Sequence, residues 1–225
     1  MATGVPTAIS LTLLDLSGGV AIIAFILAMI ICILLGLGMP TTAAYTVVAL
    51  LVAPTLISQF AVPEFAAHFF VFYAAILAGL TPPIATCVAV TCGISGGGFW
   101  TSCKEALRIS APLFVLPFAF VYHPELVSGT FEPAAIVSGF LALFGSIAMI
   151  HGINYQFVFG RGQTYGLRVA FFVAGVLAMV HPMVQVQLGA LAAVGGLYVL
   201  QTAVGRPDPL RTLRGAAGLF SGRKR

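Results

Sequence analysis

Residues 36–42 read GLGMPTT and lie between two apolar stretches of the chain, at roughly 20–37 and 42–58. A second segment of the same kind, GLTPP at residues 79–83, separates apolar stretches at roughly 64–79 and 84–99. Neither segment carries a charged residue. Glycine and proline break helices, and proline also lacks the backbone N–H donor. The sequence therefore predicts two helix breaks in consecutive apolar segments.

The composition indicates that these breaks lie inside a membrane protein. Of the 225 residues, 60% are hydrophobic and 7% are charged, and the mean hydropathy is +1.09. Soluble proteins carry roughly 25% charged residues, so this chain has too few charges to cover a globular surface. Further apolar stretches, long enough as helices to cross a bilayer, occur at roughly 105–122, 134–157, 168–184 and 188–204. We predict an all-α integral membrane protein.

The simplest arrangement of the first four stretches is a re-entrant helical hairpin over about 20–58, followed by a broken transmembrane helix over about 64–99. Non-helical backbone is tolerated at membrane depth only where protein or a water-filled cavity satisfies it. Two full spans in place of the hairpin are an alternative, and about four transmembrane helices follow. The predicted regions are a transport-site half over 1–103, a transmembrane helix and outer loop over 104–130, a C-terminal three-helix extension over 131–205 and a basic tail over 206–225.

The distribution of charge predicts the orientation. If the hairpin returns to its starting face and each later stretch crosses once, all 10 Lys and Arg residues fall on one side. Basic loops are typical of the cytoplasmic side, so the C-terminus should be cytoplasmic. Membrane topology thus accounts for the net charge of +4, and we expect no nucleic-acid partner.

Each predicted break offers groups for ions of both signs. Helices that begin inside a membrane, here after Pro40 and after Pro82, present unpaired N–H groups and part of a positive charge, which attract an anion. Carbonyls that precede a break, together with threonine hydroxyls, can coordinate a hard cation. Those groups are the carbonyls of Gly36, Leu37, Gly79 and Leu80 and the hydroxyls of Thr41, Thr42 and Thr81.

The candidate site for a sodium ion and an anionic substrate follows from these two segments. It comprises Gly36, Gly38, Pro40, Thr41, Thr42, Gly79, Thr81, Pro82 and Pro83. The alternative is that the breaks only shape helix packing, with threonine hydroxyls bonded to carbonyls one turn earlier.

No pattern of catalytic residues accompanies the breaks. Carboxylates lie in loops or at helix starts, no serine lies in a GxSxG motif, and the 4 cysteines form no CxxC pair. Four histidines could ligate haem or a metal, but the predicted orientation places His151 near the cytoplasmic end of its span and His68, His123 and His181 near the outer face. We expect packing or interfacial histidines, no enzyme activity, no cofactor and no metal other than sodium.

Three strings of residues resemble one transporter family. They are GLGMPTTAAYTVVALLVAP at 36–54, AAHFFVFYAAILAGLTPPIATCVAV at 66–90 and EALRISAPLFVLPFAFVYHPEL at 105–126. Over roughly residues 1–130 the chain is similar to the fused membrane subunit of tripartite ATP-independent periplasmic (TRAP) transporters. Residues 131–225 resemble the additional hydrophobic C-terminal region of the fused type.

The resemblance implies an elevator-type permease of the bacterial inner membrane, built from two inverted repeats. It implies symport of sodium with organic acids, which are carboxylates, delivered by a periplasmic substrate-binding protein. In that family the hairpin tip and the broken-helix loop form the sodium and substrate sites, which correspond here to 36–42 and 79–83. The fused subunit is longer, so this chain resembles its C-terminal part and is expected to assemble with the remaining N-terminal half or with other subunits.

Two other functions stay open from the sequence. One is a structural or assembly membrane subunit whose broken helices only pack and which has no transport site of its own. The other is a haem- or metal-binding membrane redox protein that uses the histidines.

Overall fold

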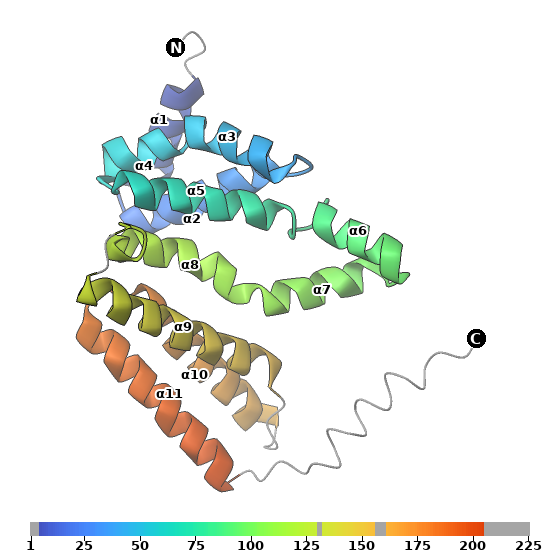
Figure 1. Ribbon diagram of the computed structural model, residues 1–225, viewed down its shortest axis with the longest axis vertical. Coiled ribbons are helices and arrows are strands. Elements are labelled where there is room, and N and C mark those ends of the chain that lie inside the picture. Colours follow the sequence, from blue (N-terminus) through green and yellow to red (C-terminus); the bar gives the residue numbers. More distant parts are fainter. Residues whose placement is uncertain (1–4, 130–131, 156–160, 205–225) are drawn as a thin grey trace.

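The computed structural model describes residues 5–129, 132–155 and 161–204, which form helices joined by short turns, with no strand among them (Figure 1). The prediction of an all-helical membrane protein is confirmed. Four helical segments of these residues are long and apolar enough to cross a membrane: Thr41–Phe60, Phe99–Tyr122, Pro133–Asn154 and Val184–Thr202.

Five helices form the N-terminal bundle, which is the upper part of Figure 1. They are α1 (Val5–Ser17), α2 (Ala21–Gly36), α3 (Thr41–Leu51), α4 (Ala53–Phe60) and α5 (Glu64–Ala78). α2 and α3 form the two arms of a hairpin, and both pack against α5. The hairpin forms because α2 is one uninterrupted apolar run that ends at Gly36, while Gly38 turns the chain with a φ of +77° and Pro40 precedes the first residue of α3.

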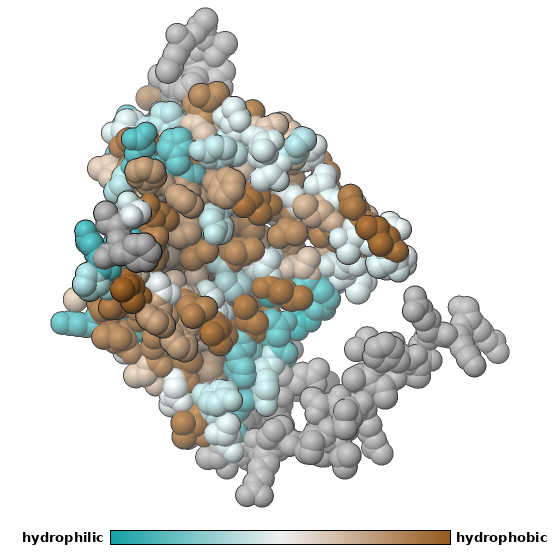
Figure 2. Space-filling model, in the orientation of Figure 1, coloured by the Kyte–Doolittle hydropathy of each residue, from teal (hydrophilic) through white to brown (hydrophobic). Residues whose placement is uncertain are grey.

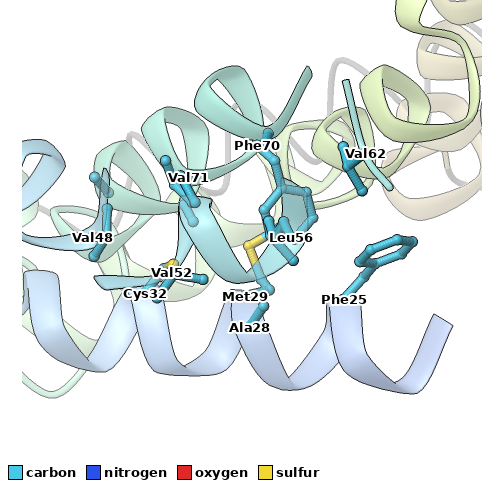
Figure 3. Close-up of a cluster of buried hydrophobic side chains, with 14 of the residues drawn as sticks. Phe25, Ala28, Met29, Cys32, Val48, Val52, Leu56, Val62, Phe70 and Val71 are labelled. Atoms are coloured by element: carbon cyan, nitrogen blue, oxygen red, sulfur yellow. The ribbon is translucent and has the colours of Figure 1, made fainter. Parts of the chain in front are cut away.

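The core of this bundle lies between the hairpin and α5 (Figure 3). Phe25, Met29 and Cys32 of α2 face side chains from α3, from α4 and the residue that joins these two helices, and from α5. Those facing side chains are Val48, Val52, Leu56, Phe70 and Val71. Close packing of these buried groups fixes where each arm of the hairpin ends, and therefore fixes the position of its tip.

Helices α6 (Thr86–Ser95), α7 (Phe99–Ile109) and α8 (Ala111–Tyr122) follow the bundle, and α6 and α7 extend to one side of it in Figure 1. α6 is shorter than the predicted apolar stretch at 84–99, because the chain leaves the helix at Gly96 with a φ of +70°. α8 lies between α5 and the C-terminal helices and contacts both.

The C-terminal bundle contains the short helix η1 (Pro124–Leu126) at its entry and three long helices, α9 (Pro133–Asn154), α10 (Arg161–Val180) and α11 (Val184–Val204). Glycines allow α9 and α10 to approach closely. A Cβ atom added to Gly175 of α10 would lie 2.7 Å from the carbonyl oxygen of Gly145 in α9. Close approach at small residues is typical of helix pairs in membranes.

The surface is apolar where a soluble protein would be polar. Figure 2 shows hydrophobic side chains over much of the visible face, with hydrophilic ones gathered mostly toward its edges. Ile94 is 85% exposed, Leu50 66% and Phe140 57%. Such side chains are stable facing lipid, in agreement with the four candidate spans.

Candidate functional site

The two helix breaks lie against each other. A Cβ atom added to Gly36, at the end of α2, would lie 2.8 Å from the Cβ of Ala78 in the last turn of α5. A Cβ added to Gly38 would lie 3.3 Å from Cδ1 of Ile84, in the second break. Segments far apart in the sequence are therefore joined at one place. Glycine is needed at position 36 because a side chain there would collide with Ala78, and at position 38 because the backbone has a φ of +77°.

The first break leaves the start of α3 open. The N–H groups of Leu37 and Met39 donate to the carbonyls of Leu34 and Gly36, at 3.4 and 3.3 Å. α3 then begins directly after Pro40, as predicted, and no side chain caps it. The first N–H groups of a helix have no carbonyl one turn earlier to bond, so this end is electropositive. The side chains of Thr41 and Thr42 are exposed beside it.

The second break is longer than predicted. α6 begins at Thr86 and not directly after Pro82, so that part of the prediction is wrong. The reason is that residues 80–84 form turns and Ala85 adopts a left-handed conformation, with a φ of +41°, before the helix starts. The N–H of Cys87 donates to the carbonyl of Gly79 at 3.1 Å, which ties the first turn of α6 to the end of α5.

Thr81 occupies the middle of the second break and is half-buried. Its hydroxyl donates a hydrogen bond of 2.6 Å to the carbonyl of Leu77, one turn earlier in α5. This bond is the one expected if the break only shapes helix packing. The bond uses the hydroxyl proton, however, and leaves the lone pairs of the oxygen available to a cation.

The carbonyl oxygens of the two glycines, like the Thr81 hydroxyl, already take part in one hydrogen bond each. Gly36 accepts the N–H of Met39, and Gly79 accepts that of Cys87. A carbonyl oxygen has two lone pairs, so each can still accept a second partner. Pro40 and Pro83 are exposed and Pro82 is half-buried, and these prolines have no N–H to offer.

Three residues at the junction were not predicted. Ile84 contacts the hairpin tip, Ala85 makes the left-handed turn, and Thr86 begins α6 with its hydroxyl 3.6 Å from where a Cβ on Gly79 would lie. Thr86 could have been found from the sequence, because it follows two prolines at the distance of one tight turn and threonine is common at helix starts. The contact made by Ile84 depends on the folded arrangement and leaves no local signal.

The histidines take part in hydrogen bonds between segments. His68 of α5 lies 3.0 Å from the hydroxyl of Tyr45 in α3, and Nε2 of His151 lies 3.1 Å from Oε1 of Gln201 in α11. Among the described residues no group of three or more His, Cys, Asp or Glu side chains could hold a metal ion. These contacts agree with the packing roles expected from the sequence.

His123 belongs to a second polar cluster, which the sequence does not predict. Its Nδ1 lies 3.1 Å from Oε1 of Glu125, and its Nε2 lies 3.0 Å from the carbonyl of His181. Ser138 of α9 donates a hydrogen bond of 2.6 Å to the same Glu125 oxygen. The cluster therefore links the end of α8 to α9 and to the turn between α10 and α11.

Hydrogen bonding determines the ionisation of Glu125. Burial tends to raise the pKa of this carboxyl group, but hydrogen bonds from Ser138 and from the backbone, together with His123, outweigh burial and hold the pKa below its usual value of 4.5. A carboxylate with a lowered pKa stabilises the folded state above its unfolded pKa, and that contribution is lost as the pH falls through the folded pKa.

Glu125→Gln should therefore lower the free energy of unfolding near neutral pH by about 1–2 kcal/mol, which is the lower part of the range for a hydrogen bond to a charged group because the Glu125 side chain is 25% exposed and solvent screens it. The difference from the unchanged protein should shrink as the pH falls below about 4.5. Thermal melting in detergent across this pH range measures it. Glu132→Gln, which removes an exposed carboxylate of the same loop, is the matched control. A Glu125→Gln effect that stayed constant to the lowest pH would contradict the assignment.

Comparison with known proteins adds one finding. A family model described as Tripartite ATP-independent periplasmic transporter, DctM component, matches residues 1–135, which include both breaks. Residues 136–225, with most of α9 and all of α10 and α11, lie outside the match. No curated protein and no solved structure matches the chain.

Proposed function

The chain belongs to the DctM component family of tripartite ATP-independent periplasmic transporters, and on that premise we propose that it forms the permease part of a sodium-coupled carrier for organic acids. Membership identifies a membrane permease component, not an enzyme, in the bacterial inner membrane. It also implies association with a periplasmic binding protein and with other membrane subunits. The coupling ion, the substrate class and the residues that bind them are the proposal.

The observation that carries the proposal is the contact between the two breaks. The last turns of α2 and α5 meet at Gly36 and Ala78, and Gly38 meets Ile84. Carbonyl oxygens at the end of a helix carry partial negative charge, and N–H groups at its start carry partial positive charge. The ends of α2 and α5 therefore lie at the same place as the segments that lead into α3 and α6. A cation and an anion can bind there side by side.

Sodium is the cation that suits the acceptors present. The carbonyls of Gly36 and Gly79 and the hydroxyl of Thr81 are neutral oxygens, and unwound backbone carbonyls are typical ligands of Na⁺ in transporters with broken helices. A carboxylate suits the starts of α3 and α6, which no side chain caps. Thr41 and Thr42 lie at the first of these starts and supply hydroxyl donors.

The site on this chain is one part of a larger one in our proposal. Gly38, Pro40, Thr41 and Thr42 are exposed, so a second element can approach the hairpin tip. We propose that the remaining half of the permease provides it, that movement is of the elevator type, and that the binding protein delivers the organic acid from the periplasm. The basic residues then face the cytoplasm by the positive-inside rule, which reporter fusions on either side of α9 would test.

A structural or assembly role without a transport site is the second candidate. The hydrogen bond from Thr81 to the Leu77 carbonyl favours this role, because the bond by itself explains why a threonine is present at this position, without any bound ion. Under this candidate, sodium would not change the stability of the chain, and substitutions at the two breaks would not change the sodium dependence of uptake.

Uptake of a radiolabelled carboxylate by the complete carrier in vesicles, with its binding protein outside, tests sodium coupling, and the same assay on variants of Thr81 then separates the two candidates. A tenfold inward sodium gradient supplies about 1.4 kcal/mol for each ion, so accumulation should rise about tenfold for each coupled sodium ion. Vesicles with equal sodium on both sides, or with choline in place of sodium, are the controls. Equal uptake in all three conditions would contradict sodium coupling.

A further inference from the structure

A cavity of about 580 Å³ lies among α7, α9 and α10, away from the two helix breaks. Its lining comprises Arg108, Gly152, Ile153, Arg168, Val169 and Phe172. Two of these six residues are cationic and three are large and apolar. Among the residues that the structure describes, no carboxylate lines the cavity.

The two arginines use only part of their hydrogen-bonding capacity. Arg108 forms an ion pair of 2.9 Å with Glu105, and its second terminal nitrogen lies 3.5 Å from the carbonyl of Ile153. Arg168 donates to the carbonyl of Tyr155 at 3.2 Å. Each guanidinium carries five N–H donors. These contacts stabilise the C-terminal end of α9, where the helix dipole is negative, but they leave donors unused.

Arg168 is the less satisfied of the two. Its Nε is buried and has no hydrogen-bond partner among the residues that the structure describes. Neither of the two ion pairs in that part of the chain includes it. A buried charged donor without an acceptor is unfavourable, so the site favours an anion that can accept from the guanidinium.

The position of the cavity relative to the spans indicates which anion. Ile153 lies at the end of the candidate span Pro133–Asn154, and Arg168 lies near the start of the apolar segment Thr164–Val180. An arginine at the end of a span lies at the boundary between the hydrocarbon and the headgroups, which places Arg168 there. Arg108 lies within the candidate span Phe99–Tyr122, and its contact with the Ile153 carbonyl places its guanidinium beside the same end of α9. The cavity thus offers cationic groups beside the apolar side chains of Val169 and Phe172, and it suits a ligand with an anionic headgroup and an apolar tail.

We propose that this cavity binds an anionic phospholipid, with Arg108 and Arg168 holding the phosphate and the apolar wall of α10 in contact with the acyl chains. Guanidinium groups match the geometry of phosphate oxygens, and basic recesses between membrane helices are suited to anionic headgroups. The lipid would thereby join α7, which lies within the family match, to α9 and α10 of the C-terminal bundle.

The test measures lipid binding by the full chain, purified in an uncharged detergent in the complex in which it is expressed. Phosphatidylglycerol, phosphatidylcholine and inorganic phosphate are titrated separately at about 0.15 M salt, which screens exposed charges. Retained lipid is counted by native mass spectrometry. We expect phosphatidylglycerol to bind at least about fivefold more tightly than phosphatidylcholine, the scale of one basic side chain at the membrane surface.

Arg168→Gln should weaken phosphatidylglycerol binding at least about fivefold. Lys104→Gln is the matched control, because it removes one charge from the exposed face of α7 but does not line the cavity. It should change binding about twofold or less, since an exposed charge is screened. Arg168→Lys keeps the positive charge but loses the planar guanidinium group that can donate two hydrogen bonds to one phosphate. This variant should therefore bind phosphatidylglycerol with intermediate affinity. If Arg168→Gln folds poorly, the affinity of Arg168→Lys for phosphatidylglycerol still tests the proposal.

Three results would overturn the proposal. One is equal binding of the two lipids, and another is equal weakening by Arg168→Gln and Lys104→Gln. The third is displacement of phosphatidylglycerol by inorganic phosphate at similar concentrations, which would identify the cavity as a site for free phosphate. Any of these three results would leave the proposed sodium and carboxylate site unaffected, because none of the residues tested belongs to the helix breaks.

Discussion

Gly145→Ala should destabilise the C-terminal bundle strongly, because α9 and α10 pack there with their backbones in contact. A Cβ at this position would lie 2.6 Å from Cγ of Met179 and 2.8 Å from the carbonyl oxygen of Gly175. Met179 is flexible and can shift, but the backbone of α10 cannot move without opening the helix pair. Overpacking of this kind costs about 1–3 kcal/mol. At roughly 2–4 °C for each kcal/mol, the thermal midpoint should fall by several degrees.

Gly139→Ala is the matched control for this substitution. Gly139 lies in the same helix, and nothing lies within 4 Å of where its Cβ would be. Alanine favours the helix by up to about 1 kcal/mol relative to glycine, so this variant should be as stable as the unchanged chain or slightly more stable. Thermal melting of both variants in the same detergent makes the comparison. Equal stability would show that α9 and α10 do not pack as closely as described.

Local signals in the sequence predict the helix breaks well at one site and less well at the other. At the first, Gly36 and Pro40 stand directly beside the end of α2 and the start of α3, so the residues themselves mark both boundaries. At the second, the helix starts three residues after Pro83, because a left-handed alanine extends the turn. Alanine rarely adopts that conformation, and nothing in its side chain indicates it.

Other parts of the fold depend on contacts that no local pattern encodes. Hydropathy does not predict α1, in which polar residues including Thr12 and Asp15 interrupt the apolar ones. The cluster around Glu125 joins residues that lie far apart in the sequence, so its members look like ordinary loop residues. The composition fixes the membrane class because it depends on the whole chain and not on any one contact.

For the candidate site, the types of residue were predictable and their relative positions were not. Glycine, proline and threonine at the breaks indicate carbonyl and hydroxyl groups free of regular helix geometry. The contact between Gly38 and Ile84 comes from the packing of the hairpin on α5. The bond from Thr81 to Leu77 spans one turn and was one of two alternatives from the sequence, which makes this residue the most informative one to change.

Thr81→Val removes the hydroxyl and keeps the shape of the side chain. If the hydroxyl oxygen is a sodium ligand, its loss should cost about 1–3 kcal/mol of ion binding, which corresponds to a roughly 5- to 150-fold higher sodium concentration for half-maximal uptake. If Thr81 only bonds back to α5, the substitution should lower the yield of folded protein without changing the sodium dependence.

Two variants control for the hydrogen bond within the helix. Thr12 of α1 donates the same kind of bond, 2.8 Å to the carbonyl of Ala8, and lies outside both breaks, so Thr12→Val should leave sodium dependence unchanged. Thr81→Ser keeps the hydroxyl and should retain most of the sodium affinity, since serine can make the same contacts.

The most direct test of the sodium and carboxylate site is therefore the sodium concentration for half-maximal uptake by vesicles containing the complete carrier, normalised to inserted protein. The site predicts a large rise for Thr81→Val, a small one for Thr81→Ser and none for Thr12→Val. Sodium dependence that is the same in Thr81→Val and Thr12→Val, at equal levels of inserted protein, would contradict coordination by the Thr81 hydroxyl and leave the second break with a packing role.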